Sequence, residues 1–131
     1  MVKTTRQKRL LIALVILAGS AVVAFAAFRV REAVLFARLS DTEKKVIGVW
    51  TWTSIDAVGR MKIRPDHRLD MWFIESKRDE DHPDARSVIR GRWKIEGTEF
   101  RYVYDPGQGS LSGQEQHGPL ADFGVRITRV R

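Results

Sequence analysis

The feature that most constrains this chain is a long apolar segment near its beginning. Residues 10–28 contain no charged side chain, and only Gly19 and Ser20 interrupt the apolar content. As an α-helix this segment would be about 28 Å long, close to the roughly 30 Å hydrocarbon thickness of a bilayer. A helix pairs every backbone N–H and C=O internally, as an apolar solvent requires. Residues 10–28 are therefore predicted to form one transmembrane helix, preceded by a basic tail at residues 1–9.

A cleaved secretory signal is the main alternative to a retained anchor. It would share the basic opening, the apolar segment and small residues such as Ala24 and Ala26 near a cleavage site. The apolar segment is longer than the usual core of a signal, about 7 to 15 residues, and the small residues lie inside it rather than after it. These two features favour a single-pass anchor in contact with membrane lipid.

The charges on either side of the span do not decide its orientation. Four Lys or Arg residues precede the span and five follow it by residue 45, whereas the orientation rule needs an excess on the cytoplasmic side. The signal-like opening favours a cytoplasmic N-terminus. We therefore expect a single-pass protein of the bacterial inner (cytoplasmic) membrane whose C-terminal part is periplasmic.

The composition excludes several classes of site. The chain has 131 residues and no Cys, so it holds one small domain besides the span and has no disulfide, thiolate zinc site or iron–sulfur cluster. The net charge is +7, but the 19 Lys and Arg beyond the span exceed the 16 acids by only three. This excess is too small to indicate a nucleic-acid groove, so no nucleic-acid partner is expected.

The residues after the span predict a helical stalk and a short capped turn. Residues 29–39 contain no helix breaker and place apolar side chains at helical spacing. The sequence Ser-Asp-Thr-Glu at residues 40–43 is a capping box, which marks the start of a new helical turn. The stalk and the turn are together assigned to residues 29–45.

After the capped turn the apolar spacing changes to the period of two that is typical of strands. Met61 and Ile63, for example, alternate with three basic residues. Polar or Gly-rich stretches at 75–86 and 105–119 separate such segments and are expected to be loops. The six predicted strands are residues 46–55, 59–64, 69–74, 87–95, 99–104 and 123–130. This pattern predicts a mainly β fold over residues 46–131, a small antiparallel six-stranded meander that forms a barrel or half-barrel.

Three short motifs resemble those of lipocalins and of small bacterial lipocalin-like domains. They are G-V-W at residues 48–50, I-R-P-D-H at 63–67 and G-R-W-K-I-E-G at 91–97. The resemblance implies a calycin-like β-domain in which the Trp of the first motif closes one end. It also implies that a basic residue of the last strand, Arg126 or Arg129, packs across that Trp. The chain departs from true lipocalins, which have eight strands, by lacking about two, and the resemblance therefore implies a fold rather than a ligand.

The aromatic residues of the predicted strands have two interpretations. At strand spacing they are the ordinary filling of a small barrel, which we favour because the inward-facing side chains are bulky. Alternatively they line a pocket for an apolar ligand, which needs mostly apolar walls with a few polar groups. The pocket candidates are Trp50, Trp52, Trp93, Phe100 and Tyr102.

A second set of residues is a candidate contact surface for a partner. Trp72 should point away from the face that carries Met71 and Phe73. It is then either exposed beside Ile74, as a contact for protein or membrane, or covered by the 75–86 loop. Basic side chains on one strand face would meet anionic lipid or an acidic partner, with plain solvent exposure as the simpler interpretation. These basic candidates are Arg60, Lys62 and Arg64.

No combination of residues indicates catalysis or a cofactor. The three His residues fall in or next to predicted turns, and no motif for an activated Ser, a phosphate loop or a dinucleotide site occurs. The acids and His at residues 79–84 lack the spacing of a calcium or zinc site, which favours a solvated loop. We therefore expect no catalytic residue, no metal site and no cofactor.

Two functions from different classes remain. The favoured one is a non-enzymatic accessory or stabilising subunit of a larger membrane complex, such as a respiratory, photosynthetic, secretion or cell-envelope assembly. Its partner would be an integral membrane protein. The alternative is a membrane-tethered lipocalin-like binder of an apolar small molecule or lipid, which requires an interior cavity on the order of a few hundred Å³.

Overall fold

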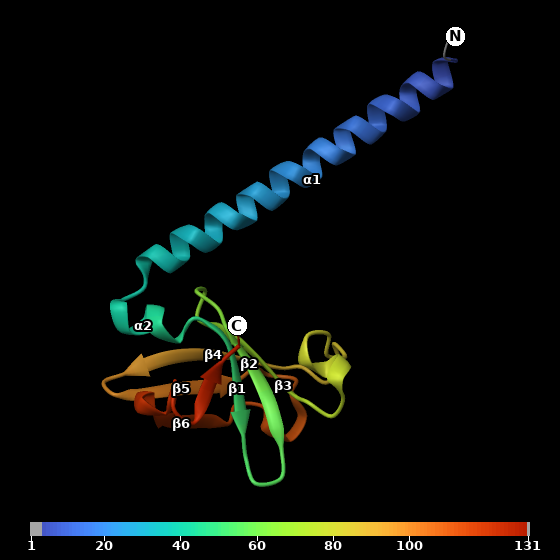
Figure 1. Ribbon diagram of the computed structural model, residues 1–131. Coiled ribbons are helices and arrows are strands. Elements are labelled where there is room, and N and C mark those ends of the chain that lie inside the picture. The colour runs from blue at the N-terminus through green and yellow to red at the C-terminus, as the bar shows by residue number, and fades with distance from the viewer. Residues whose placement is uncertain (1–3, 131) are drawn as a thin grey trace. The chain divides into compact units, whose positions relative to one another are not determined.

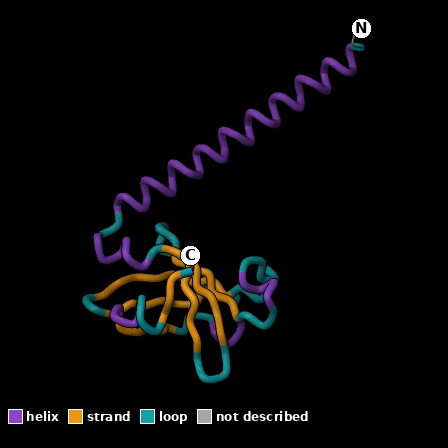
Figure 2. Tube along the Cα trace, viewed as in Figure 1, coloured by secondary structure: helices purple, strands orange, loops and turns teal. Residues whose placement is uncertain are grey.

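The chain forms two compact units, Met1–Arg38 and Leu39–Arg131, in a computed structural model that describes residues 4–130. Within its described residues the first unit is a single helix, and strands dominate the second (Figures 1 and 2). Residues 1–3 of the predicted basic tail and Arg131 lie outside the described residues. The two units are hereafter the anchor helix and the β-domain.

The anchor helix, α1 (Thr5–Arg38), runs without interruption through both the predicted span and the predicted stalk. None of its residues is buried, and it is the one helix in the described part of the chain that is long and apolar enough to cross a membrane. Its 34 residues correspond to about 51 Å, so roughly 20 Å would extend beyond the hydrocarbon layer. The Ser20 hydroxyl donates to the Ile16 carbonyl at 2.9 Å, which satisfies the polar group within the span.

The β-domain begins with the short helix α2 (Asp41–Val46). Its predicted capping box is confirmed: the Glu43 backbone N–H donates to the Ser40 hydroxyl at 3.1 Å, and the Ser40 N–H donates to the Glu43 carboxylate at 3.0 Å. These two bonds satisfy backbone donors that the helix itself leaves free. At the other end of α2, Val46 is buried in the core.

The predicted mainly β, antiparallel fold is confirmed, with seven strands in one curled sheet that forms a half-barrel (Figure 1). Its strands follow the order β6-β5-β4-β3-β2-β1-β7. They are β1 (Gly48–Thr53), β2 (Val58–Ile63), β3 (Arg68–Phe73), β4 (Ile89–Glu96), β5 (Glu99–Tyr104), β6 (Glu115–Pro119) and β7 (Ile127–Arg129). The seventh strand is β6, which lies in the Gly-rich stretch expected to be a loop. It has no apolar alternation and joins the sheet by backbone pairing with β5.

The pairing of β7 with β1 brings the last strand back to the first, yet the sheet does not close. Every pair of neighbouring strands is antiparallel, so β6 and β7 run in the same direction and form no ladder with each other among residues 4–130. Closing an antiparallel meander needs an even number of strands. The connection at 120–126, which includes the 3₁₀ turn η3 (Leu120–Asp122), leads from β6 to β7 and leaves this seam without strand pairing.

One end of the half-barrel is closed by Arg129 stacked on Trp50. The guanidinium carbon lies 4.5 Å from the centre of the indole ring, and the guanidinium donates to the carbonyls of Ile47 (2.9 Å) and Lys45 (3.0 Å). The Trp50 indole N–H donates to the Val46 carbonyl at 2.8 Å. Arg129 thus takes the position that the lipocalin resemblance left open between two arginines, and it joins the last strand to the first and to α2.

Gly48 makes this stacking sterically possible. Its φ of +137° is a conformation that side chains disfavour, and a Cβ at this position would lie 2.8 Å from a guanidinium nitrogen of Arg129. The glycine of the G-V-W motif is therefore explained by the arginine that passes over it.

A second set of contacts fastens α2 to the turn between β2 and β3. The His67 imidazole forms a 2.6 Å hydrogen bond with the Glu43 carboxylate and packs on Trp93, with ring centres 4.7 Å apart. The pKa of Glu43 is lowered, first by the hydrogen bond from the Ser40 backbone and then by His67. The Trp93 indole N–H donates to the Arg64 carbonyl at 3.0 Å.

Replacing Arg129 should open the closed end. We expect Arg129→Ala to lower the free energy of unfolding by about 1–3 kcal/mol, because it removes a cation–π contact and two hydrogen bonds to carbonyls. Urea unfolding of the full chain in mild detergent, followed by Trp fluorescence, measures this. Arg126→Ala is the matched control, and an equal loss in both variants would contradict the assigned role.

The lowered pKa of Glu43 predicts a specific loss of stability in acid. A carboxyl with a depressed pKa in the folded state stabilises the fold above its unfolded pKa of about 4.3, and this contribution disappears as pH falls through the lower folded value. Glu43→Gln should therefore flatten the acid side of the stability profile measured by thermal unfolding. Glu75→Gln, in the loop after β3, should leave that profile unchanged; a wild-type-like acid side in Glu43→Gln would refute the prediction.

Candidate functional site

The concave face of the half-barrel contains a cavity of about 400 Å³ that is partly open to solvent. It lies towards the end of the sheet opposite α2, because it takes Trp52 from near the end of β1, Phe73 from the end of β3 and Ile89 from the start of β4. Phe73 is 46% exposed and marks the open side. The deepest walls come from the buried residues Met61, Met71, Phe100 and Tyr104.

Trp52 is held in the wall by a glycine on the neighbouring strand. Gly59 is its direct cross-strand partner, and a Cβ on Gly59 would lie only 2.2 Å from the indole ring. The indole also meets Phe73 edge to face, with ring centres 5.3 Å apart. Its N–H is buried and has no acceptor among the described residues. The Trp52 indole therefore lies across Gly59, in a position that any residue with a Cβ would block.

The polar groups of the cavity come from β5, β6 and η3. Tyr102 and Tyr104 pack edge to face with ring centres 5.6 Å apart, and Asp122 belongs to the lining as well. His117 also borders the cavity, but it is exposed and is the cross-strand partner of the outward-facing Arg101. Burial raises the pKa of the Tyr102 phenol, and a hydrogen bond with Tyr104 raises it further. Tyr102 therefore remains a neutral phenol at physiological pH. The site is thus apolar with a few polar groups, as ligand sites usually are.

The predicted pocket residues fall into two groups. Trp52, Phe100 and Tyr102 line the cavity. Trp50 and Trp93 are buried at the closed end and form core there instead. Phe100 also belongs to the buried core, and Trp52 and Tyr102 pack against it, so these three side chains are part of the core packing and also line the cavity.

The sequence interpretation missed the β6 and η3 side of the cavity. His117, Asp122 and Phe123 all line it, but β6 had been expected to be loop. Phe123 packs edge to face on both Trp50 (5.0 Å) and Phe100 (5.1 Å). Phe123 had been placed at the start of the predicted last strand, 123–130, but that prediction did not indicate its contact with the core.

The structure resolves the alternatives for Trp72, the central residue of the predicted contact surface. Trp72 is 7% exposed, because the 3₁₀ turn η1 (Lys77–Glu80) of the long loop covers it and the indole N–H donates to the Asp79 carbonyl at 2.7 Å. The alternative in which Trp72 is exposed is therefore wrong, and the alternative in which the 75–86 loop covers it is confirmed. Ile74 is partly buried.

The predicted basic face of β2 is largely paired with acids. Arg60 lies beneath the same loop and pairs with Asp81 at 3.1 Å. Arg64 pairs with Asp70 at 3.4 Å, and Lys62 is exposed. An anionic surface would therefore meet less free positive charge than the sequence alone indicates.

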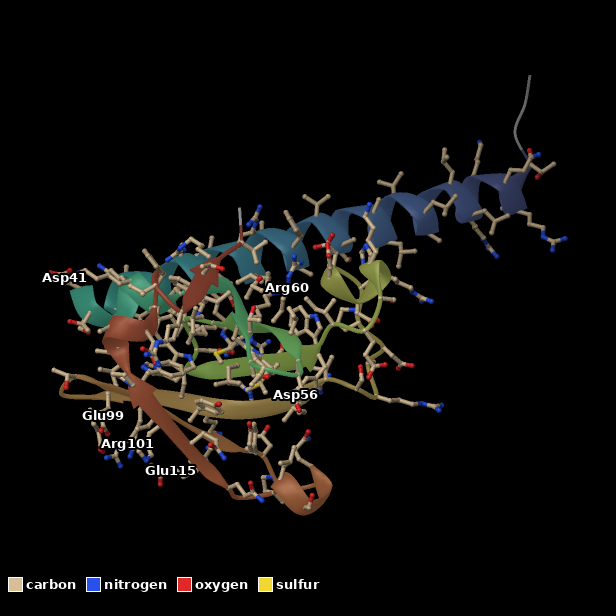
Figure 3. The ribbon with its side chains drawn as sticks, turned by 60° about the horizontal axis from the view of Figure 1, so that its bottom comes forward. Asp41, Asp56, Arg60, Glu99, Arg101 and Glu115 are labelled. Atoms are coloured by element: carbon tan, nitrogen blue, oxygen red, sulfur yellow. The ribbon has the colours of Figure 1, made fainter. Side chains whose placement is uncertain are left out.

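The outer faces of β5 and β6 carry a cluster of opposite charges. Arg101 lies between Glu99 and Glu115, at 3.0 and 3.4 Å, as Figure 3 shows. It also pairs with Glu96 at 3.2 Å. Because strand side chains alternate, this cluster lies on the face opposite the cavity. Such exposed pairs contribute little to stability.

Among residues 4–130 no group of three or more His, Asp or Glu side chains is placed to hold a metal ion. Comparison with protein-family models, curated proteins and solved structures finds no match to this chain. The chemistry of the site therefore rests on the residues of the cavity itself.

Filling the space above Gly59 should displace Trp52. Gly59→Ala places a methyl group inside the indole, so we expect a loss of about 1–3 kcal/mol in unfolding free energy and a red shift of Trp emission. Gly118→Ala is the matched control, because its Cβ would meet only the Asp122 carboxylate, at 4.0 Å. Unchanged emission and stability in Gly59→Ala would contradict the described position of Trp52.

Proposed function

We propose that the protein is a non-enzymatic, membrane-tethered binder of an apolar small molecule or lipid. The observation that carries this proposal is the cavity of about 400 Å³ with walls of aromatic and aliphatic side chains. Its volume falls within the range of small-molecule sites, about 300–1,000 Å³. Of the two functions that the sequence left open, only the ligand binder requires such a cavity.

The resemblance to lipocalin-like domains supports the same function. A half-barrel that is closed at one end by Arg129 on Trp50 and has its cavity towards the other end is compatible with that fold. The chain differs in having seven strands, and the seam between β6 and β7 would let the cavity widen around a ligand.

The anchor helix supports a location at a membrane. We place the chain in the bacterial cytoplasmic membrane with the β-domain in the periplasm, on the apolar α1 and the signal-like opening of the sequence. Apolar molecules partition into the bilayer. A tethered cavity would therefore work where such ligands are concentrated.

A second candidate is the accessory or stabilising subunit of a larger membrane complex. Two observations favour it: α1 has no buried residue, and the β-domain exposes Ile55 fully and Val125 at 76%. Exposed apolar side chains of this kind occur at contact surfaces. Stoichiometric co-purification of an integral membrane protein in mild detergent would favour this candidate, and a chain that purifies alone would count against it.

The binding proposal is tested by what the protein carries from the membrane. Full-length chain isolated in polymer nanodiscs, extracted with organic solvent and analysed by mass spectrometry, should be enriched in one apolar compound. Ile89→Trp fills the cavity and should lose this compound, whereas Val103→Trp, on the exposed side of β5, should retain it. The same extract from wild type and Ile89→Trp would refute the proposal.

A further inference from the structure

The lining of the cavity contains one acidic residue and no Lys or Arg among the described residues. The acidic residue is Asp122. Arg126 follows Asp122 by four residues, but it is exposed and does not belong to the lining. Arg101 precedes Tyr102, but it points outward and is paired with Glu99 and Glu115 (Figure 3). A ligand in the cavity therefore meets one carboxylate and no fixed positive side chain.

This arrangement is unfavourable for an anionic ligand. A charged group that leaves water for apolar surroundings needs a partner of opposite charge or several hydrogen bonds. A carboxylate in this cavity would find no Lys or Arg and would be repelled by Asp122, which is itself partly buried. The lining therefore offers an ionised carboxylate no Lys or Arg as a counter-charge among the described residues.

The polar groups that remain suit a neutral ligand. Tyr102 and Tyr104 are adjacent phenols on the inward face of β5, and a phenol both donates and accepts hydrogen bonds. A hydroxyl or carbonyl oxygen is matched by such groups without any charge. The aliphatic and aromatic walls accommodate the rest of the molecule.

We propose that the cavity selects uncharged apolar molecules with a hydroxyl or carbonyl group, and that Asp122 is the residue that excludes their anionic counterparts. This inference rests on the proposed binding function and specifies its ligand class. Fatty alcohols and isoprenoid alcohols belong to the selected class, and fatty-acid carboxylates to the excluded class.

The test uses tetradecanol and tetradecanoate, which share one chain and differ in the head group. Full-length protein in nanodiscs is equilibrated with both at about pH 8, where the acid is ionised, then reisolated, and the retained compounds are quantified by mass spectrometry. Retention by Ile89→Trp is subtracted as the lipid background. We expect wild type to retain the alcohol about ten-fold or more over the acid.

Two variants then test the role of Asp122. Asp122→Asn should raise retention of the acid several-fold and leave that of the alcohol unchanged. Asp56→Asn removes the same charge from the turn between β1 and β2 (Figure 3), outside the cavity, and should change neither. Circular dichroism confirms the fold of both variants, and the wild-type ratio tests selectivity without any substitution.

The outcomes separate this inference from the proposed function. Retention of neither compound above the Ile89→Trp background would overturn the binding function and the inference with it. Equal retention of both, or preference for the acid, would leave binding in place and overturn the selectivity. An unchanged ratio in Asp122→Asn would overturn the role of Asp122.

Discussion

The stacking of Arg129 on Trp50 is the interaction on which the β-domain depends. β7 has three residues, and its one ladder is with β1, besides a single bridge from Ile127 to Phe123, so backbone pairing by itself holds the last strand weakly. The guanidinium adds a contact with the indole face and two hydrogen bonds to the carbonyls of Lys45 and Ile47. One side chain therefore fixes the last strand, the first strand and the end of α2 together, and it closes that end of the half-barrel.

The number of strands explains why the other end has room for a cavity. The two edge strands of the seven-stranded antiparallel sheet are β6 and β7. They run in the same direction and form no ladder with each other among the described residues. The segment at 120–126 takes the place of a further strand and sends Phe123 into the core. Large aromatic side chains then line the concave face without filling it, and the proposed binding function rests on that unfilled space.

Features that depend only on residues close together in the sequence were predictable. The capping box at Ser40 and Glu43 is local, and the inward positions of Met61, Ile63 and Met71 follow from strand alternation. β6 was not predictable, because its backbone pairing leaves no pattern in side chains such as Gln116 and His117. The cover over Trp72 comes from the loop directly after β3 and was one of two alternatives that the sequence left open. The cavity depends on how distant segments fold back, which single-strand spacing does not encode. The sequence therefore predicted part of the candidate site: it indicated Trp52, Phe100 and Tyr102 as pocket residues, but not Asp122.

The central claim is that an apolar cavity accessible from outside exists on the concave face of a half-barrel closed by Trp50 and Arg129. Xenon enters such cavities and is directly visible to X-rays. A crystal structure of the full chain determined under xenon pressure tests the claim most directly. We expect xenon density among Trp52, Met71, Phe100 and Tyr104. A xenon-free interior filled by these side chains would contradict it.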